Sequence, residues 1–521
     1  MSIMSTPRLA PTRPARSLLA RSLQTPPRSA RALRLEFKRN AVPYVLPLLA
    51  AVFYFNAVRT ADGFPPVWTL RASAIPDQML FEFTAFAGGL AAWAGSRDGR
   101  RKTVDLVAAT PRPAWARQGI ALAGSLGWLL LAYLAGVAVL YVQTALQATW
   151  GGPPLWPVFV GAAGVTAVAV IGFTCGVFFP GRFTAPLVAI GVLVLYQTGF
   201  REALGVTATS GTYALLSPAT NPPGVDAGVY HHAAPDLWIV QVMFMGGIAV
   251  ALVGVLGLAP ELRQLASARS PGSLRAALAR GDGWLLRAVA VILVGSGVAA
   301  SSTAFALAGT AKPDAAGGWE IPALHSAAGD RSVPATQDCT SSSGFQICVH
   351  PAFGFYLDAL AAALDPVAAE IAGLPGVPAG AREVASVSGG QDVQSGIAAN
   401  PAVFEFTAEH VGTMFGQFLG NGQDPVGWRE GFQQGLLDAF LTGRAPHAGP
   451  GPAPLGPAQQ AVEDALLTAV RSRPLNPGAT SAGLSAAAQR FAALPASARR
   501  AWLAALLAAL RAGTITPAQI P

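Results

Sequence analysis

The stretch that decides the fold is QGIALAGSLGWLLLAYLAGVAVLYV, residues 118–142, which contains no charged residue. An α-helix rises about 1.5 Å per residue, so a run of this length crosses the roughly 30 Å hydrocarbon core of a bilayer. Six more apolar stretches of near-spanning length occur in the first part of the chain, at residues 41–58, 79–96, 157–179, 183–200, 237–258 and 286–308. The pattern predicts an α-helical integral membrane protein with seven spans.

The composition supports this interpretation. Apolar residues make up 52% of the 521 residues and charged residues only 12%, about half the roughly 25% typical of soluble proteins. These values exclude an ordinary soluble enzyme. They also exclude a disordered chain, which combines low hydrophobicity with high charge. With three cysteines, the chain is not a disulfide-dense scaffold.

The basic residues are unevenly distributed. Residues 1–308 contain 24 Lys and Arg against 11 Asp and Glu, whereas residues 309–521 contain 11 against 16. The basic residues flank the apolar stretches instead of gathering in a polar domain, which argues against nucleic acid as a partner. With the N-terminus inside, the cytoplasmic segments hold 21 basic residues and the outer loops three. The positive-inside rule therefore predicts a cytoplasmic N-terminus and an extracytoplasmic C-terminal domain.

The spans divide the chain into eight parts. The first four are a basic cytoplasmic tail with an interfacial helix (1–40), a six-span domain (41–258), a basic cytoplasmic linker (259–285) and a seventh span (286–308). The last four are a linker (309–335), an extracytoplasmic domain (336–443), a Pro/Gly linker (444–457) and a C-terminal helical segment (458–521). The Arg, Ala, Gly and Pro bias predicts a bacterial cell membrane protein. An organellar transit peptide at the Arg-rich N-terminus is the alternative.

The C-terminal part contains two cysteines in QDCTSSSGFQICVHP, residues 337–351. The Ser-Ser-Ser-Gly turn between two extended runs predicts a β-hairpin that brings Cys339 and Cys348 together, and an oxidising compartment favours a disulfide between them. A zinc site formed by these cysteines with His325 and His350 is the alternative. Helical periodicity predicts a mostly α domain, with helices near residues 353–372, 404–420, 425–442, 458–473, 482–494 and 497–513.

Two features inside the predicted spans are notable. Glu82 lies in the outer turn of the second span, where an ionisable side chain is costly unless it faces protein or water. Glu82 is therefore either a group that lines a pathway or a carboxylate that reaches the outer interface. Gly172 and Gly176 form a small-xxx-small pair in the fourth span, which predicts close helix packing.

The cytoplasmic loop between the second and third spans reads SRDGRRKTVDLVAATPRPAWAR, residues 96–117. Thr103 can cap a short helix, and Asp105 suits its N-terminal end. Thr110 precedes Pro111 and is therefore disfavoured in the α conformation. The pattern predicts a helix of about two turns, exposed to the cytoplasm and able to dock against a partner.

This loop resembles the one found in the membrane subunits of type-2 ABC exporters, which has the form acid-x-G-T-acid-L-L-x-A-T-P followed by basic residues. The match runs from Thr103 to Pro111, while Lys102 replaces the usual Gly and Asp98 is the only upstream acid. The resemblance implies that residues 97–117 contact a separate ATPase subunit, which binds ATP and Mg, and that the chain pairs with a second copy or a related permease. The residues it assigns to ATPase coupling are Arg100, Arg101, Lys102, Thr103, Val104, Asp105, Leu106, Val107, Thr110 and Pro111.

The sequence contains no P-loop of its own, since that motif requires Lys after Gly. Its only lysines are Lys38, Lys102 and Lys312, preceded by Phe37, Arg101 and Ala311. We therefore expect no enzyme activity, cofactor or metal in this chain. Two other functions stay open: a membrane-anchored envelope scaffold or sensor whose outer domain binds a ligand, with the loop serving only as a topology signal, and a membrane-bound hydrolase, for which the sequence offers no catalytic constellation.

Overall fold

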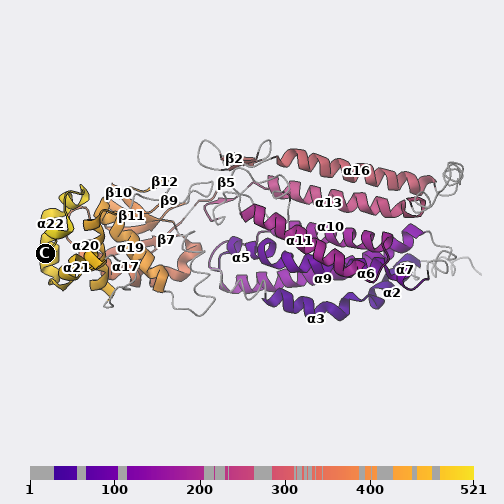
Figure 1. The fold of residues 1–521 in the computed structure, drawn as a ribbon, viewed down its shortest axis with the longest axis horizontal. Helices are drawn as coiled ribbons and strands as arrows, with labels where there is room; N and C mark the ends of the chain where they lie inside the picture. The colour runs from indigo at the N-terminus through magenta and orange to yellow at the C-terminus, as the bar shows by residue number, and fades with distance from the viewer. Residues whose placement is uncertain are drawn as a thin grey trace, which may run out of the picture.

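The computed structural model shows an elongated molecule with a helix bundle at one end and a domain formed by residues 336–521, the C-terminal domain, at the other (Figure 1). The residues that the structure describes are 28–55, 66–103, 114–204, 216, 229–232, 234–262, 284–309, 312–313, 319–321, 325–326, 331–334, 336–342, 344–385, 393–399, 402–407, 426–448, 455–471 and 482–521.

The bundle consists of long apolar helices with short helical segments at its ends. The long helices are α9 (Ala114–Gln147), α10 (Trp156–Phe178), α11 (Thr184–Leu204), α13 (Asp236–Gly257) and α16 (Trp284–Ala308). The shorter segments are α2 (Arg28–Arg39), α3 (Val42–Phe53), α5 (Trp68–Ala74), the π-helix η2 (Ile75–Met79), α6 (Leu80–Gly95) and α7 (Arg97–Arg100).

Five helices in the described part of the chain are long and apolar enough to cross a membrane: Trp115–Gln147, Trp156–Phe178, Asp236–Gly257, Leu285–Ala308 and Pro351–Ile371. The first four coincide with predicted spans, whereas the fifth packs within the C-terminal domain. The other predicted spans correspond to α6 and to the shorter apolar helices Val42–Phe53 and Thr184–Tyr196. The structure is consistent with a helical membrane protein, and the count of seven spans stays a prediction.

Close packing of α6 against α10 depends on the predicted glycine pair. A Cβ atom added at Gly172 would lie 2.1 Å from the Gly88 carbonyl oxygen, and one added at Gly176 would lie 2.2 Å from the Ala92 oxygen. The backbones of the two helices therefore touch where these glycines lie, and the prediction of close packing is confirmed. A glycine also allows close contact between α16 and α13, because a Cβ atom added at Gly297 would lie 2.4 Å from the Ala251 nitrogen.

The C-terminal domain contains a five-stranded mixed sheet with the order β10-β11-β8-β7-β6. Its strands are β6 (Asp338–Ser342), β7 (Phe345–Val349), β8 (Gly380–Glu383), β10 (Gly396–Ala399) and β11 (Ala402–Phe406). The predicted hairpin is β6 and β7, which pair antiparallel with Cys339 opposite Cys348. The parallel pairs β7–β8 and β8–β11 extend this hairpin into a sheet that the sequence analysis did not predict.

The prediction of a helix at residues 404–420 is wrong at its start, because residues 402–406 form β11. Phe404 and Phe406 are buried while Glu405 between them is not, which is the period of two of a strand with one buried face. Pairing with β8 on one side and β10 on the other satisfies the backbone groups of this segment. Residues 408–420 lie outside the described residues.

The other predicted helices of this domain are present: the 3₁₀ turn η4 (Pro351–Tyr356) with α17 (Leu357–Ile371), α19 (Val426–Thr442), α20 (Pro457–Arg471), α21 (Ala482–Ala493) and α22 (Ala496–Arg511). One hydrophobic core joins them to the sheet and includes residues on both sides of the predicted 444–457 linker. The buried Arg499 ties α22 to α17 through an ion pair with Glu370, N···O 2.6 Å.

The C-terminal domain is seated directly on one end of the bundle. The short strand β1 (His231–His232), which precedes α13, pairs antiparallel with β5 (Arg331–Ser332). The Thr149 hydroxyl, in the turn between α9 and α10, donates to the Pro351 carbonyl at 2.7 Å. Val67 and Val229, from the bundle side, are buried in the core of the C-terminal domain. Small pairings also occur between β2 (Lys312–Pro313), β3 (Trp319–Ile321) and β4 (His325–Ser326), and between β9 (Val393–Gln394) and β12 (His447–Ala448).

Candidate functional site

The predicted coupling loop begins at the end of the bundle opposite the C-terminal domain, which we call the basal end (Figure 1). Ser96 ends α6 and is buried, and the single turn α7 follows directly. Lys102 has φ of 54°, in the left-handed region, and this reverses the chain so that the Thr103 N–H reaches the Asp98 carbonyl at 3.1 Å. The chain thus makes a compact turn before the predicted coupling helix.

The described residues include only the first part of the predicted coupling site. Arg100 is the last residue of α7, and Arg101, Lys102 and Thr103 follow it. The remaining predicted residues, Val104, Asp105, Leu106, Val107, Thr110 and Pro111, lie outside the described residues. The helix expected from Thr103 to Ala109 therefore stays a prediction.

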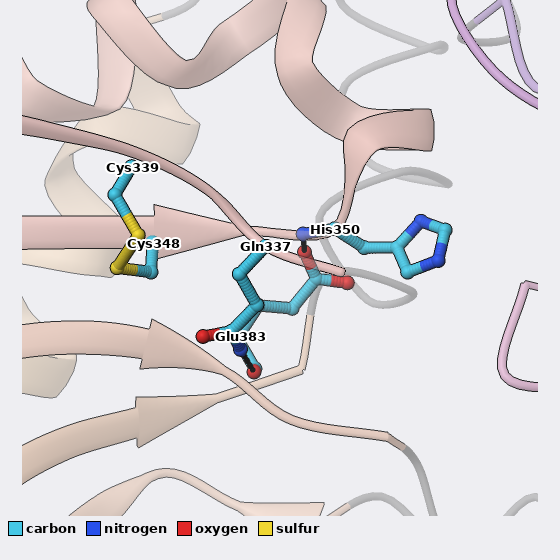
Figure 2. Close-up of a disulfide and its surroundings, with 5 residues drawn as sticks. All are labelled: Gln337, Cys339, Cys348, His350 and Glu383. Atoms are coloured by element: carbon cyan, nitrogen blue, oxygen red, sulfur yellow. Dashed lines mark hydrogen bonds between the residues drawn. A yellow bond between two sulfur atoms is a disulfide. The ribbon is translucent and has the colours of Figure 1, made fainter. Parts of the chain in front are cut away.

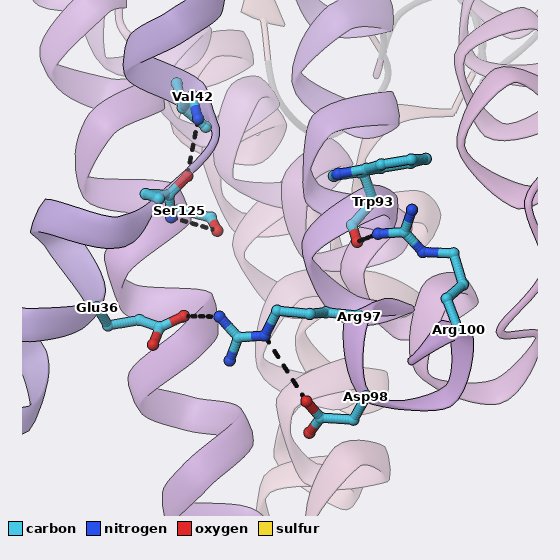
Figure 3. Close-up of polar contacts among 8 residues, drawn as sticks. Glu36, Val42, Trp93, Arg97, Asp98, Arg100 and Ser125 are labelled. Carbon is cyan, nitrogen blue, oxygen red and sulfur yellow. Dashed lines mark hydrogen bonds and ion pairs between the residues drawn. The ribbon is translucent and has the colours of Figure 1, made fainter. Parts of the chain in front are cut away.

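Arg97 joins this turn to the N-terminal helix α2. Its guanidinium forms an ion pair with Glu36 and lies 3.6 Å from the Asp98 carboxylate (Figure 3). Arg100 points the other way, along α6, where its guanidinium carbon lies 3.2 Å from the centre of the Trp93 ring and its Nη2 donates to the Trp93 carbonyl at 2.8 Å. Partial burial, and then the neighbouring charge of Arg101, lower the pKa of Arg100, but an arginine stays protonated at neutral pH.

The helix α2 is held against α9 by aromatic and polar contacts. Phe37 stacks on Trp128 with ring centres 4.3 Å apart, and the Trp128 indole N–H donates to the Phe37 carbonyl at 2.8 Å. Gly127 makes room for this contact, since a Cβ there would lie 3.0 Å from the Phe37 ring. The buried Asn40 donates to Ser125 at 3.0 Å and accepts from the Val42 N–H, which fixes the corner between α2 and α3 (Figure 3).

A third contact joins α7 to the turn between α10 and α11. A Cβ atom added at Gly99 would lie 2.3 Å from the Cβ atom of Pro180, so only glycine fits there without a shift. The turn after α6 therefore touches α2 on one side and the α10–α11 turn on another. The elements that meet here, α2, the turn at α7 and the α10–α11 turn, contain many basic residues, namely Arg31, Arg34, Lys38, Arg39, Arg97, Arg100, Arg101, Lys102 and Arg182.

Glu82, the predicted pathway residue, lies in the first turn of α6 and is half-buried. It follows the π-helix η2, whose Pro76 carbonyl accepts a hydrogen bond from the Tyr196 hydroxyl of α11 at 3.2 Å. π-helical turns occur often at functional sites. The position of Glu82 is compatible with either of its two predicted roles.

The predicted disulfide between Cys339 and Cys348 is present, with their Cα atoms 4.1 Å apart, and Cys175 is free. The His350 ring points away from the disulfide (Figure 2). The zinc alternative gains no support, because the two cysteine sulfurs bind each other. Within the described ranges, no group of three or more His, Cys, Asp or Glu side chains is placed to hold a metal ion.

The structure also shows a buried titratable cluster, which we call the junction cluster: His350, Glu383, Tyr230 and Tyr356. The Glu383 carboxylate is 1% exposed and accepts the His350 backbone N–H at 2.7 Å (Figure 2). The His350 ring is fully buried, and its Nδ1 accepts the Ala352 N–H at 3.1 Å, which caps η4. Sequence analysis considered His350 only as a zinc ligand and did not single out Glu383, since the contacts that bury them are distant in sequence.

The junction cluster lies where the C-terminal domain meets the bundle. The His350 ring packs edge-on against Trp150 and Tyr230, with ring centres 4.6 and 5.0 Å apart. Burial raises the pKa of Glu383 to about 8, although hydrogen bonds from the His350 backbone and the Tyr230 side chain oppose the shift. Burial lowers the pKa of His350 to about 4, against the opposing charge of Asp338. Both side chains are therefore mostly neutral at pH 7.

Comparisons of this chain with family models, with curated proteins and with solved structures found no match.

Proposed function

We propose that this chain is a permease subunit of an ABC exporter, which forms a translocation path with a second copy or a related permease. A separate ATPase subunit binds ATP and Mg and acts on the chain through residues 97–117. The proposal rests on the resemblance of Thr103–Pro111 to the coupling loop of type-2 exporters, and on the way in which the start of this loop is attached to the bundle.

The observation that carries the proposal is the set of contacts made by α7. This turn continues directly from α6, its Arg97 pairs with Glu36 of α2, and its Gly99 touches Pro180 between α10 and α11. A loop that passes movement from an ATPase to the helices must be packed against those helices. Energetic coupling between two sites is carried by elements that touch and that can adopt two arrangements. A loop that served only to set topology would not need these contacts.

The arrangement of charge supports the proposed orientation. The basic residues around α2 and α7 lie at the basal end, and the C-terminal domain lies at the opposite end (Figure 1). In the proposal the basal end faces the cytoplasm of a bacterium, where the ATPase is, and the C-terminal domain projects from the outer face of the cell membrane. Glu82 then lies toward the outer end of the path.

The C-terminal domain favours a second candidate, a membrane-anchored envelope scaffold or sensor. Helices α17 and α19 pack on one face of its sheet. On the other face, Arg382 and Glu405 are paired neighbours across β8 and β11, and Gln346 is exposed. Such a polar face is suited to a ligand or protein partner, and a scaffold would need no ATPase.

The two candidates are distinguished by copurification from the native host in mild detergent. The permease proposal expects a stoichiometric partner whose sequence contains a P-loop. Val104→Asp combined with Leu106→Asp should abolish this copurification, because interface anchors of this kind typically contribute about 1–3 kcal/mol each, and Thr110→Ala should leave it unchanged. If no P-loop protein copurifies with the wild-type chain, or if the double variant binds it normally, the scaffold candidate is favoured instead.

A further inference from the structure

The buried carboxyl group of Glu383 lies between the C-terminal domain and the bundle. It ends β8, and its Oε2 accepts the backbone N–H of His350, the residue whose ring contacts Trp150 and Tyr230 from the bundle side. The hydrogen bond from Thr149 to Pro351, at 2.7 Å, also crosses this junction. The Val333 N–H, three residues before the C-terminal domain, donates to the Tyr230 carbonyl at 2.7 Å. A change at Glu383 therefore acts where the two parts of the molecule meet.

We propose that Glu383 is a proton-controlled latch: its neutral carboxyl group keeps the C-terminal domain seated on the bundle, and its ionisation loosens this junction. The inference goes beyond the proposed transport function and does not depend on it.

The surroundings of Glu383 offer little to stabilise a negative charge. The groups that act on its carboxyl are the His350 backbone N–H and the Tyr230 side chain, and among the described residues no cation is one of them. Its neighbour Arg382 forms an ion pair with Glu405 instead. Tyr356 is buried, and its pKa is raised by burial and then by Glu383 and Tyr230, so this phenol stays neutral. An ionised carboxylate at this site lacks both water and a counter-charge, which is costly.

Hydration of Glu383 requires movement at the aromatic contacts. Glu383 is 1% exposed, and the residue whose backbone N–H binds it, His350, packs its ring against the Trp150 and Tyr230 rings. We expect water to reach the carboxylate when these contacts separate. The remaining titratable neighbours do not supply the switch above pH 6.5. His350 is neutral there in the closed junction, and in the open junction it loses its remaining charge as the pH rises above 6.5, which changes the opening constant by no more than about twofold. The exposed Asp338 acts on His350 without offsetting its burial.

The direction of the pH effect follows from linkage. The pKa of Glu383 is about 8 in the closed junction, against 4.5 for an ordinary glutamate. A raised pKa means that the closed form binds the proton more tightly, so the stabilisation is complete below pH 4.5 and is lost as the pH rises toward 8. The opening constant should increase by at most tenfold per pH unit, and above pH 8 it should level off because both forms are ionised.

Hydrogen–deuterium exchange of the full chain in detergent tests the latch. After correction for the intrinsic exchange rate, peptides covering residues 149–156, 229–232 and 350–356 should exchange up to roughly fifteenfold faster at pH 8 than at pH 6.5, with at most about a further twofold increase by pH 9. Glu383→Gln cannot ionise and should show no such pH dependence. Glu405→Gln, on the neighbouring strand, should behave like the wild type.

Tyr230→Phe provides a second variant that keeps the Glu383 carboxyl. It removes the side-chain hydrogen bond that lowers the pKa of Glu383, so the rise in exchange should continue to a higher pH before it levels off. The latch is overturned if wild-type exchange at the junction is independent of pH, or if Glu383→Gln shows the same increase as the wild type. It is also overturned if Tyr230→Phe, in a folded chain, does not change the pH at which the exchange rate stops rising.

Discussion

Glu36 of α2 forms an ion pair with Arg97 of α7, which lies 61 residues further along the chain. The pair joins the helix that precedes the first predicted span to the turn that opens the predicted coupling loop. Its side chains are 20% and 35% exposed, so solvent screens the interaction in part. The contact is therefore better suited to positioning α7 than to holding the fold together.

We expect a double-mutant cycle of Glu36→Gln and Arg97→Gln to give a coupling energy of about 0.5–1 kcal/mol, the upper part of the range for partly exposed pairs. Reversible unfolding of the detergent-solubilised chain measures this energy, and high salt should reduce it. Arg101→Gln, a change of an exposed arginine in the same turn, should show no coupling to Glu36→Gln. A coupling energy of zero would show that this ion pair does not help to position α7.

Gly172→Val should destabilise the bundle by about 1–3 kcal/mol, because the new side chain has to push α10 away from the Gly88 carbonyl of α6. Gly191→Val on α11 is the matched control: its Cβ would meet nothing within 4 Å. The free energy of unfolding of both variants in detergent tests this contrast. Equal effects of the two substitutions would show that the backbones of α6 and α10 are not in contact at Gly172.

Peptide mapping without reduction should recover Cys339 linked to Cys348 and Cys175 as a free thiol. Since the bond closes a loop of about ten residues, chain entropy implies stabilisation on the order of 2–3 kcal/mol. Thermal unfolding with and without a reductant measures the effect, and replacement of Cys175 with Ala is the control. Recovery of Cys339 and Cys348 as free thiols would contradict the structure of the hairpin.

The junction should also respond to acid through His350, and this response is visible when Glu383 cannot titrate. The pKa of His350 is lowered to about 4 from 6.5, so its contribution is present above pH 6.5 and is lost as the pH falls through 4. In a Glu383→Gln background, exchange at residues 350–356 should therefore increase by at most tenfold per unit from pH 6.5 down to about 4. In the wild type, the opposite response of Glu383 should cancel much of this increase.

His350→Asn in the same background is the test of that assignment. An asparagine oxygen can still accept the Ala352 N–H that caps η4, but it does not titrate. The acid response should therefore disappear while protection at pH 7 is largely kept. If the response persists, it comes from another group.

The sequence predicted those features that depend on local patterns. Hydropathy alone identifies α9, α10, α13 and α16, because a mostly uncharged apolar run long enough to cross a bilayer seldom forms anything other than a membrane-spanning helix. The Ser-rich turn between two short extended runs was enough for the β6–β7 hairpin and its disulfide.

Features that depend on contacts between distant segments were not predicted. The strand β11 was expected to be helical, because what makes it a strand is its pairing with β8 and β10. The junction cluster was missed for the same reason: Glu383 and His350 are ordinary polar residues until three segments of the chain bury them together. The Gly99–Pro180 contact likewise has no signal in either local sequence.

Gly99→Ala tests whether the contact between α7 and the α10–α11 turn transmits movement, and this prediction rests on the proposed transport function. The new Cβ atom would lie 2.3 Å from the Cβ and 2.7 Å from the Cγ of Pro180, atoms of a ring that is closed onto the backbone and cannot swing away, so the two turns must separate. We expect the variant to bind its ATPase, whose contact residues are unchanged, but to lose most of the coupling between ATP hydrolysis and transport. ATPase copurification and transport in reconstituted vesicles measure the two effects separately.

Substitutions at Pro180 determine whether this clash is the cause. Pro180→Gly removes both ring atoms and leaves the Pro180 Cα at 3.7 Å, an ordinary contact distance, so Gly99→Ala combined with Pro180→Gly should regain coupling. Pro180→Ala keeps the Cβ atom at 2.3 Å and should not restore coupling to Gly99→Ala. The two double variants differ by one methyl group, so a difference between them cannot come from loss of the proline ring. Equal behaviour of the two would show that the contact with Pro180 does not transmit the movement.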